Sequence, residues 1–97
     1  MLFVIIGSPR SNTEAAQHRV LQLFTNWKEP SGYTNTALYG TADGGFVAVA
    51  EAESAAAVAE AMAWLVPFFD VKPLPAVTAD GVVPVLQRVY SWAESVR

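Results

Sequence analysis

Four side chains have the chemistry to hold or activate a small organic molecule. Asn35 and Tyr39 lie four residues apart in one predicted strand, so both should point to the same face of a sheet. Arg10 follows Ser8-Pro9 where the chain leaves its first strand, and its guanidinium could grip a carboxylate or enolate with two hydrogen bonds. Trp64 lies at the flank of a predicted helix stripe, where its ring could reach a pocket. Each also has a simpler interpretation, as a solvated arginine or as ordinary packing.

The remaining polar residues argue against most catalytic chemistries. His18 is the only histidine, and it lies opposite the apolar stripe of its predicted helix, so it should face solvent. The chain has no cysteine and no carboxylate cluster, so we expect neither a metal nor a cofactor. Ser8 has no matching His and Asp for a nucleophilic triad. Glu51 could serve as a general base if it were desolvated, or be an exposed strand end. No catalytic residue can be named from the sequence.

The composition is that of one small, apolar domain, residues 1–97. The chain is 53% hydrophobic and only 15% charged, with a formal net charge of −3. Excess apolar surface on a small domain usually ends in an interface. The negative charge and the scattered basic residues argue against nucleic-acid binding, and no apolar run reaches the roughly 20 residues of a membrane span. The N-terminus lacks the pattern of a signal peptide, so we expect a cytoplasmic protein.

Hydrophobic periodicity predicts seven elements in the order β-α-β-β-α-β-α. The predicted strands are 2–6, 33–41, 45–52 and 70–77. The three helices between and after them should begin at caps Ser11 or Asn12, Ser54 and Asp80, with Pro84 in the first turn of the last helix. The first six elements match the split β-α-β plan of a ferredoxin-like α+β domain with a four-stranded antiparallel sheet. The two prolines of 70–77 mark an edge strand.

Two of the predicted strands, 2–6 and 45–50, have no polar face and therefore need cover on both sides. Right-handed crossovers place the first two helices on the same face of the sheet. The other face must then be covered by the third helix or by the sheet of another subunit. We favour another subunit, because the apolar composition points to association.

The dipeptide Asp43-Gly44 predicts a hairpin with a two-residue turn. That turn pairs Tyr39 with Ala48 and Asn35 with Ala52, which puts all four side chains on one face of the sheet. The valines of the second strand then point to the other face. We predict that the valine face meets a partner sheet. The alanine face should lie under the helices, where small side chains either leave room for a ligand or let the helices dock closely.

Several short motifs together span nearly the whole chain. They are Ser8-Pro9-Arg10 after the opening strand, Gly44-Gly45-Phe46 at the hairpin, Glu51 at the end of that strand, and 70–75 before a C-terminal helix. In these the chain resembles a small bacterial family, domain of unknown function 3303, within the dimeric α/β-barrel superfamily. Gly7 departs from the family pattern, in which an aromatic residue often precedes the Ser-Pro.

The resemblance implies a homodimer whose two sheets pack face to face as a dimeric α/β barrel. It also implies a small organic molecule bound between sheet and helices, since superfamily members include cofactor-independent monooxygenases, isomerases and haem-binding proteins. We therefore expect a homodimeric domain that binds a small apolar molecule, with cofactor-independent oxygenation or isomerisation as its candidate reactions. Tyr39, Asn35 or Arg10 would then polarise a substrate oxygen. The alternative is a non-catalytic interaction or assembly module.

Overall fold

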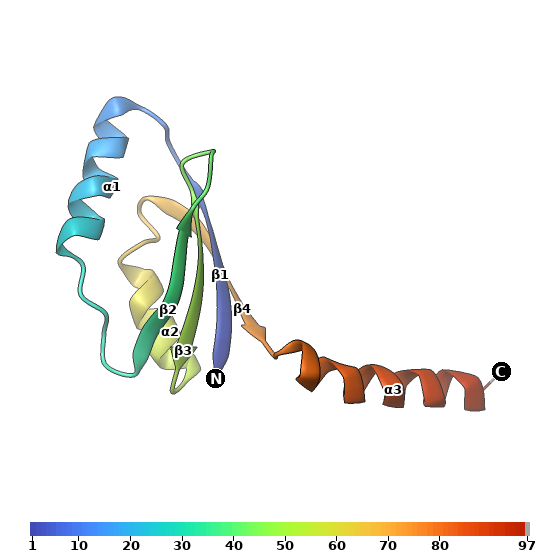
Figure 1. Ribbon diagram of the computed structural model, residues 1–97. Helices are drawn as coiled ribbons and strands as arrows, with labels where there is room; N and C mark the ends of the chain where they lie inside the picture. The colour runs from blue at the N-terminus through green and yellow to red at the C-terminus, as the bar shows by residue number, and fades with distance from the viewer. Residues whose placement is uncertain (97) are drawn as a thin grey trace.

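Residues 1–96, which the computed structural model describes, form four strands and three helices in the predicted order (Figure 1). Their bounds are β1 (Leu2–Pro9), α1 (Glu14–Asn26), β2 (Tyr33–Gly40), β3 (Phe46–Ala52), α2 (Ala55–Ala63), β4 (Phe69–Ala76) and α3 (Ala79–Ser95). The strands form one antiparallel sheet in the order β2-β3-β1-β4. This is the ferredoxin-like α+β arrangement that the sequence predicts.

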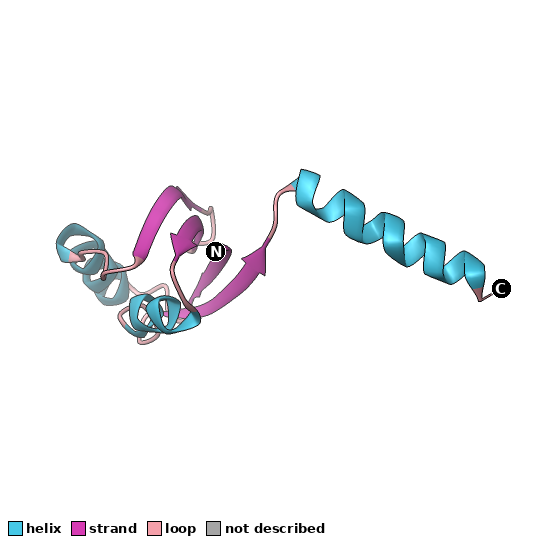
Figure 2. Cartoon of the chain, turned by 90° about the horizontal axis from the view of Figure 1, so that it is seen from below, coloured by secondary structure: helices cyan, strands magenta, loops and turns pink. Residues whose placement is uncertain are grey.

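Both crossover helices, α1 and α2, cover the same face of the sheet (Figures 1 and 2). The order places β4 at one edge, as its prolines predict, because a residue without an N–H fits only where no neighbouring strand needs the donor. The side of the sheet away from these helices we call the open face. Its apolar side chains are Leu2, Val4, Ile6, Ala37, Tyr39, Val47, Val49, Leu74 and Ala76.

The helix-covered face carries the core. Phe46 and Phe69 meet edge to face with ring centroids 5.0 Å apart, and Phe24 of α1 packs against both rings at 6.0 Å. Beneath α2, the small side chains of β3 and α2 are buried together, and Ala50 and Ala61 are fully inaccessible. The alanine face thus lies under the helices as predicted, and its small residues belong to the packed core.

The helices begin at threonine and serine side chains that accept hydrogen bonds from the first turn. Ser54 caps α2 as predicted, with its Oγ accepting from the Ala57 N–H. The other two predicted caps are wrong: Thr13 caps α1 in place of Ser11 or Asn12, and Thr78 caps α3 in place of Asp80. Because α3 begins before Asp80, Pro84 lies inside the helix and not in its first turn.

The predicted register of the β2–β3 hairpin is also wrong. Thr41 N–H donates to Gly45 O at 3.0 Å, so the loop has three residues, and Gly44 takes the positive φ of 87° that ends such loops. The Asp43 carboxylate accepts hydrogen bonds from the Thr41 hydroxyl and the Gly45 N–H, which lower its pKa and hold the loop. The extra loop residue pairs Tyr39 with Val47.

A β-bulge at Thr36 then shifts the pairing again, so that Asn35 lies opposite Ala50. The two shifts have different effects on the side chains. Asn35 keeps the helix-covered face that the sequence predicts, whereas Tyr39 moves to the open face, since a one-residue slip inverts a strand's faces. The predicted face shared by Asn35 and Tyr39 does not exist.

Helix α3 projects away from the rest of the domain (Figures 1 and 2). The chain measures 58 × 29 × 18 Å, and its radius of gyration is 17.2 Å. A compact domain of this length has a radius of gyration of about 12.5 Å. No residue of α3 is buried. The third helix therefore does not fold over the open face of its own sheet.

Candidate functional site

The candidate site is an apolar pocket between the C-terminal end of α1 and the end of α2. Its volume is about 300 Å³. The residues that line it are Leu23, Asn26, Trp27, Lys28 and Trp64. Two indole rings and a leucine form the apolar wall, while an amide and an ammonium group supply polar contacts. Ligand pockets typically combine an apolar lining with a small number of polar groups.

Both tryptophans take their positions from the way their helices end. Trp27 is the C-cap residue of α1, and its backbone N–H donates to Leu23 O at 2.7 Å. Trp64 is the C-cap residue of α2 and is 59% exposed, while the next residue, Leu65, is 2% exposed. Because Leu65 anchors the turn in the core, Trp64 is held outward at the pocket.

The indole Nε1–H of Trp27 is buried and donates to no acceptor among the described residues. A buried donor without an acceptor costs on the order of 1–3 kcal/mol. The ring of Trp27 packs edge to face against Tyr33 with centroids 6.2 Å apart, which restricts its movement. The pocket is thus lined by a residue whose hydrogen-bonding capacity the protein itself leaves unused.

A polar network lies behind the Trp27 ring. The Tyr33 hydroxyl donates to Asn35 Oδ1 at 2.7 Å, and the Asn35 backbone N–H donates to Glu29 Oε1 at 3.0 Å. Burial of Tyr33, with the Glu29 carboxylate as the second cause, raises its pKa to about 12. Asn35, a predicted ligand-binding residue, therefore orients Tyr33, and its side-chain oxygen is already occupied.

Arg10, another predicted ligand-binding residue, is engaged by the protein. Its Nε donates to Val66 O at 2.7 Å and to Phe69 O at 3.2 Å, and Nη1 lies 3.0 Å from an Asp70 carboxylate oxygen. The guanidinium thus ties the end of β1 to the turn between α2 and β4. Arg10 also borders a surface hollow of about 390 Å³ at the N-terminal end of α1.

Tyr39 borders a different hollow, about 220 Å³ in volume, between α1 and the β2–β3 hairpin. The residues lining it include Phe24, Leu38 and Phe46. The cavity expected beside Tyr39 is therefore present, but Tyr39 is 63% exposed and belongs to the open face. Of the four predicted residues, only Trp64 lies in the Trp27–Trp64 pocket. The structure distributes Asn35, Arg10 and Tyr39 over three other places.

The sequence of this chain matches the family model of DUF3303, a domain of unknown function, over residues 1–90. The chain belongs to the DUF3303 family. The match extends through the core and into most of α3, as far as residue 90. No curated protein and no solved structure matches the chain.

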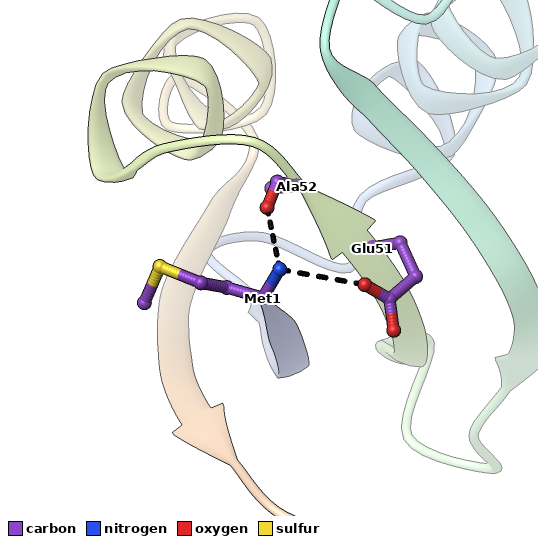
Figure 3. A network of polar contacts seen from close by, with 3 residues as sticks. All are labelled: Met1, Glu51 and Ala52. Carbon is purple, nitrogen blue, oxygen red and sulfur yellow. Dashed lines mark hydrogen bonds and ion pairs between the residues drawn. The ribbon is translucent and has the colours of Figure 1, made fainter.

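Two candidate groups of this DUF3303 domain do not take part in the pocket. Glu51 is exposed on the open face, and its carboxylate lies 3.4 Å from the Met1 ammonium group, which also donates to Ala52 O at 2.8 Å (Figure 3). It is therefore not desolvated, as a general base at this position would require. His18 faces solvent as predicted.

Among residues 1–96, no three His, Asp or Glu side chains gather in a group that could hold a metal ion. None of the described helices has the length and apolar character to cross a membrane.

Sequence reasoning missed Lys28, Asn26 and Leu23 as pocket residues and placed Trp27 in the core. The sequence contained part of this information, because Trp27 and Lys28 directly follow the last turn of α1 and so lie at the end of the helix. What could not be read from the sequence is that α2 ends opposite this point and brings Trp64 to it.

Proposed function

We propose that this DUF3303 domain binds a small, planar, mostly apolar organic molecule in the Trp27–Trp64 pocket, and that it does so as a homodimer. The observation that carries the proposal is the lining of the pocket, in which two indole rings meet two polar side chains. A volume of about 300 Å³ matches the lower end of the range for small-molecule sites, roughly 300–1,000 Å³.

The lining favours an aromatic ligand that carries an oxygen acceptor or a negative charge. Indole faces stack on planar rings, and each aromatic pair contributes about 0.5–1.5 kcal/mol beyond the area it buries. The Lys28 ammonium and the second N–H of the Asn26 amide, whose Nδ2 also donates to Gln22 O at 2.8 Å, can donate hydrogen bonds to such a ligand, whereas the buried Trp27 Nε1–H does not face the open pocket. No carboxylate is among the five lining residues, so an anionic ligand meets no like charge there.

The same lining limits the chemistry that the pocket could perform. Donors stabilise an anionic intermediate, but removal of a proton needs a base, and no carboxylate or histidine lines the pocket. Cofactor-independent oxygenation or isomerisation would therefore require a substrate that enters already ionised, such as a phenolate or an enolate. The donors would then hold that anion while the apolar walls exclude water.

The homodimer is supported by the open face. Its central row runs Ala37–Val49–Val4–Leu74, one residue from each strand, with no charged side chain. Ile6 and Leu74 are 40% and 41% exposed in the single chain. The two neighbouring rows of the same face contain one charged side chain each, Lys72 and Glu51, so the apolar row has a charged rim. An exposed apolar row of this kind on a small domain is typical of an interaction site. We propose that two open faces pack against each other, sheet to sheet.

Binding can be tested with 2-naphthoate as the probe, using isothermal titration calorimetry. Trp64→Leu should weaken binding about tenfold or more, because it removes one wall of the pocket. Trp92→Leu is the matched control, since Trp92 is also an exposed tryptophan, at 66%, but lies on α3 outside the pocket. It should leave the dissociation constant unchanged within about twofold.

Charge can be tested in the same assay. Lys28→Met should weaken 2-naphthoate by about fivefold, as expected for a solvent-accessible ion pair of up to about 1 kcal/mol, and should leave the neutral 2-naphthamide unaffected. Equal losses in the Trp64 and Trp92 variants would show non-specific adsorption and would refute the proposed site.

The second candidate function is a non-catalytic assembly module. It is favoured by one observation, the amount of apolar surface on the open face and on α3. A homodimer that binds neither probe, and that shows no co-purified small molecule by native mass spectrometry, would select this function over ligand binding.

A further inference from the structure

Helix α3 is a regular helix that buries none of its residues against its own chain. It spans 17 residues, none of them buried, and projects from the sheet (Figure 2). Five apolar side chains of α3 and its C-cap residue Val96 recur at helical spacing and form what we call the α3 stripe: Val82, Val85, Leu86, Val89, Ala93 and Val96. Leu86 is 47% exposed, Val89 53% and Val96 63%. Such a stripe normally faces a core.

The sequence of α3 is a poor helix former. It contains Gly81, Pro84 and four valines, all of which disfavour helix relative to alanine, and Pro84 removes one backbone hydrogen bond. With 17 residues, α3 is only slightly longer than the roughly 12–15 residues below which isolated helices are marginal even when rich in alanine, and most helical stability in proteins comes from packing of the apolar face. Helix α3 therefore needs a surface that the rest of the domain does not provide.

The area of the open face indicates that this surface belongs to a second copy of the chain. The four strands of the open face, spaced about 4.8 Å apart and roughly 25 Å long, present roughly 500 Å². A stable homodimer of ordinary size buries about 600–1,000 Å² on each partner. One side of a helix about 25 Å long and about 10 Å wide adds roughly 250 Å². The open face alone falls short of an ordinary dimer interface, whereas the open face together with α3 reaches it.

We propose that α3 is an exchanged arm, which packs the α3 stripe against a second copy of this chain and so completes the interface of the open face. The proposal rests on the homodimer proposed above. The arm joins the sheet through Val77 and Thr78 alone, and Thr78 caps the helix through its side chain and through backbone bonds to Gly81 and Val82. Packing on a second copy is compatible with this cap, because the link and the helix then keep the conformation described here.

Hydrogen exchange measured by mass spectrometry over a range of protein concentrations tests the proposal. In the dimer, amides of residues 82–96 should be protected. On dilution below the dimer dissociation constant, their exchange should accelerate at least about tenfold, because the isolated helix is marginal. Equal protection at every concentration would show that α3 folds onto its own domain, and would overturn the proposal.

A charge placed on the stripe should act in the same way as dilution. Val89→Asp should raise the dimer dissociation constant about 100-fold or more and abolish the protection of α3, since it puts a carboxylate in an apolar contact. Ser91→Asp is the matched control, because Ser91 lies on the polar side of the same helix and is exposed. It should leave both measurements unchanged. Circular dichroism of each variant verifies that the sheet domain is folded.

The two proposals fail in distinguishable ways. If light scattering shows a dimer while α3 exchanges freely at all concentrations, the exchanged arm is refuted and the sheet-to-sheet homodimer stands. A monomer at all concentrations refutes both. If the Trp64 variant loses naphthoate binding but remains a dimer, the result supports the proposed pocket and leaves both the homodimer and the exchanged arm in place.

Discussion

Gly7 is the position where a single added carbon has the best-defined consequence. It lies on β1 directly opposite Phe46, on the helix-covered face. A Cβ at this position would overlap Cε1 of the Phe46 ring and lie 2.6 Å from Cδ1 and Cζ. Displacement of the ring is opposed by its packing, because Phe46 is 5% exposed and is held edge to face by Phe69 and Phe24, although it also borders the hollow of about 220 Å³ between α1 and the hairpin.

From this geometry we expect Gly7→Ala to destabilise the domain by about 1–2 kcal/mol. Overpacking a filled core costs about 1–3 kcal/mol, and replacing glycine within a strand returns about 0.5–1 kcal/mol through the entropy of the unfolded chain. The effect should reverse when the ring is absent. Phe46→Ala alone should cost about 3–5 kcal/mol, and in that background Gly7→Ala should be neutral or stabilising, which is a coupling of about 1–3 kcal/mol.

Urea unfolding followed by circular dichroism measures all four corners of this cycle, and unchanged m-values would show that the same surface is exposed on unfolding in each variant. Gly40→Ala is the matched control, because Gly40 is also a strand glycine paired with Phe46, but a Cβ there meets no atom within 4 Å. It should be neutral or slightly stabilising. The reasoning fails if Gly7→Ala and Gly40→Ala are equally stable, or if the cycle is additive.

Three further predictions concern stability. The raised pKa of Tyr33 favours its neutral form in the folded state, so that contribution is complete below pH 10 and is lost between pH 10 and about 12. A rise of the Tyr33 pKa from 10.0 to about 12 corresponds to at most about 3 kcal/mol of stability, which solvent screening reduces to roughly half. Tyr33→Phe should flatten the curve of stability against pH in this range. An unchanged slope would show that Tyr33 is not the group responsible. Arg10→Lys should lower the free energy of unfolding by about 1–2 kcal/mol, because lysine cannot reproduce the planar donors to Val66 O and Phe69 O. A thermal unfolding midpoint equal to that of the wild type would show that these two hydrogen bonds do not stabilise the fold. Ser54→Ala should cost about 1 kcal/mol by removing the cap of α2, and Ser54→Thr should restore most of it in the same measurement.

The order of elements could be predicted because each depends on local pattern. The stripe of α1, the cap Ser54 and the edge prolines all carried information within a few residues, and chirality then placed both helices on one face. The hairpin register could not, since Asp43-Gly44 is compatible with either a two-residue or a three-residue loop. The Thr41 hydroxyl and the Gly45 backbone N–H donate hydrogen bonds to the Asp43 carboxylate, and these bonds select the three-residue loop.

The candidate site was predictable only where one residue's own surroundings decided its exposure. Trp64 is next to the buried Leu65 and borders a pocket, while its role in binding a ligand stays a prediction. Arg10 looked free because its acceptors, the carbonyls of Val66 and Phe69, lie more than 55 positions away in the chain. Tyr39 was placed on the wrong face by a slip of one residue. Each miss depends on a contact between distant segments, and sequence pattern does not report such contacts.

The bulge at Thr36 and the prolines of β4 have a consequence for aggregation. They lie on the two outermost strands of the sheet, β2 and β4. At the bulge, the Thr36 hydroxyl donates to Val49 O and the ladder is interrupted, and Pro73 and Pro75 present no N–H to a neighbouring strand. Regular, unblocked edges would let chains add strand by strand into open-ended fibres. With both outer strands interrupted in this way, the sheet is a poor template for the strand-by-strand addition of further chains.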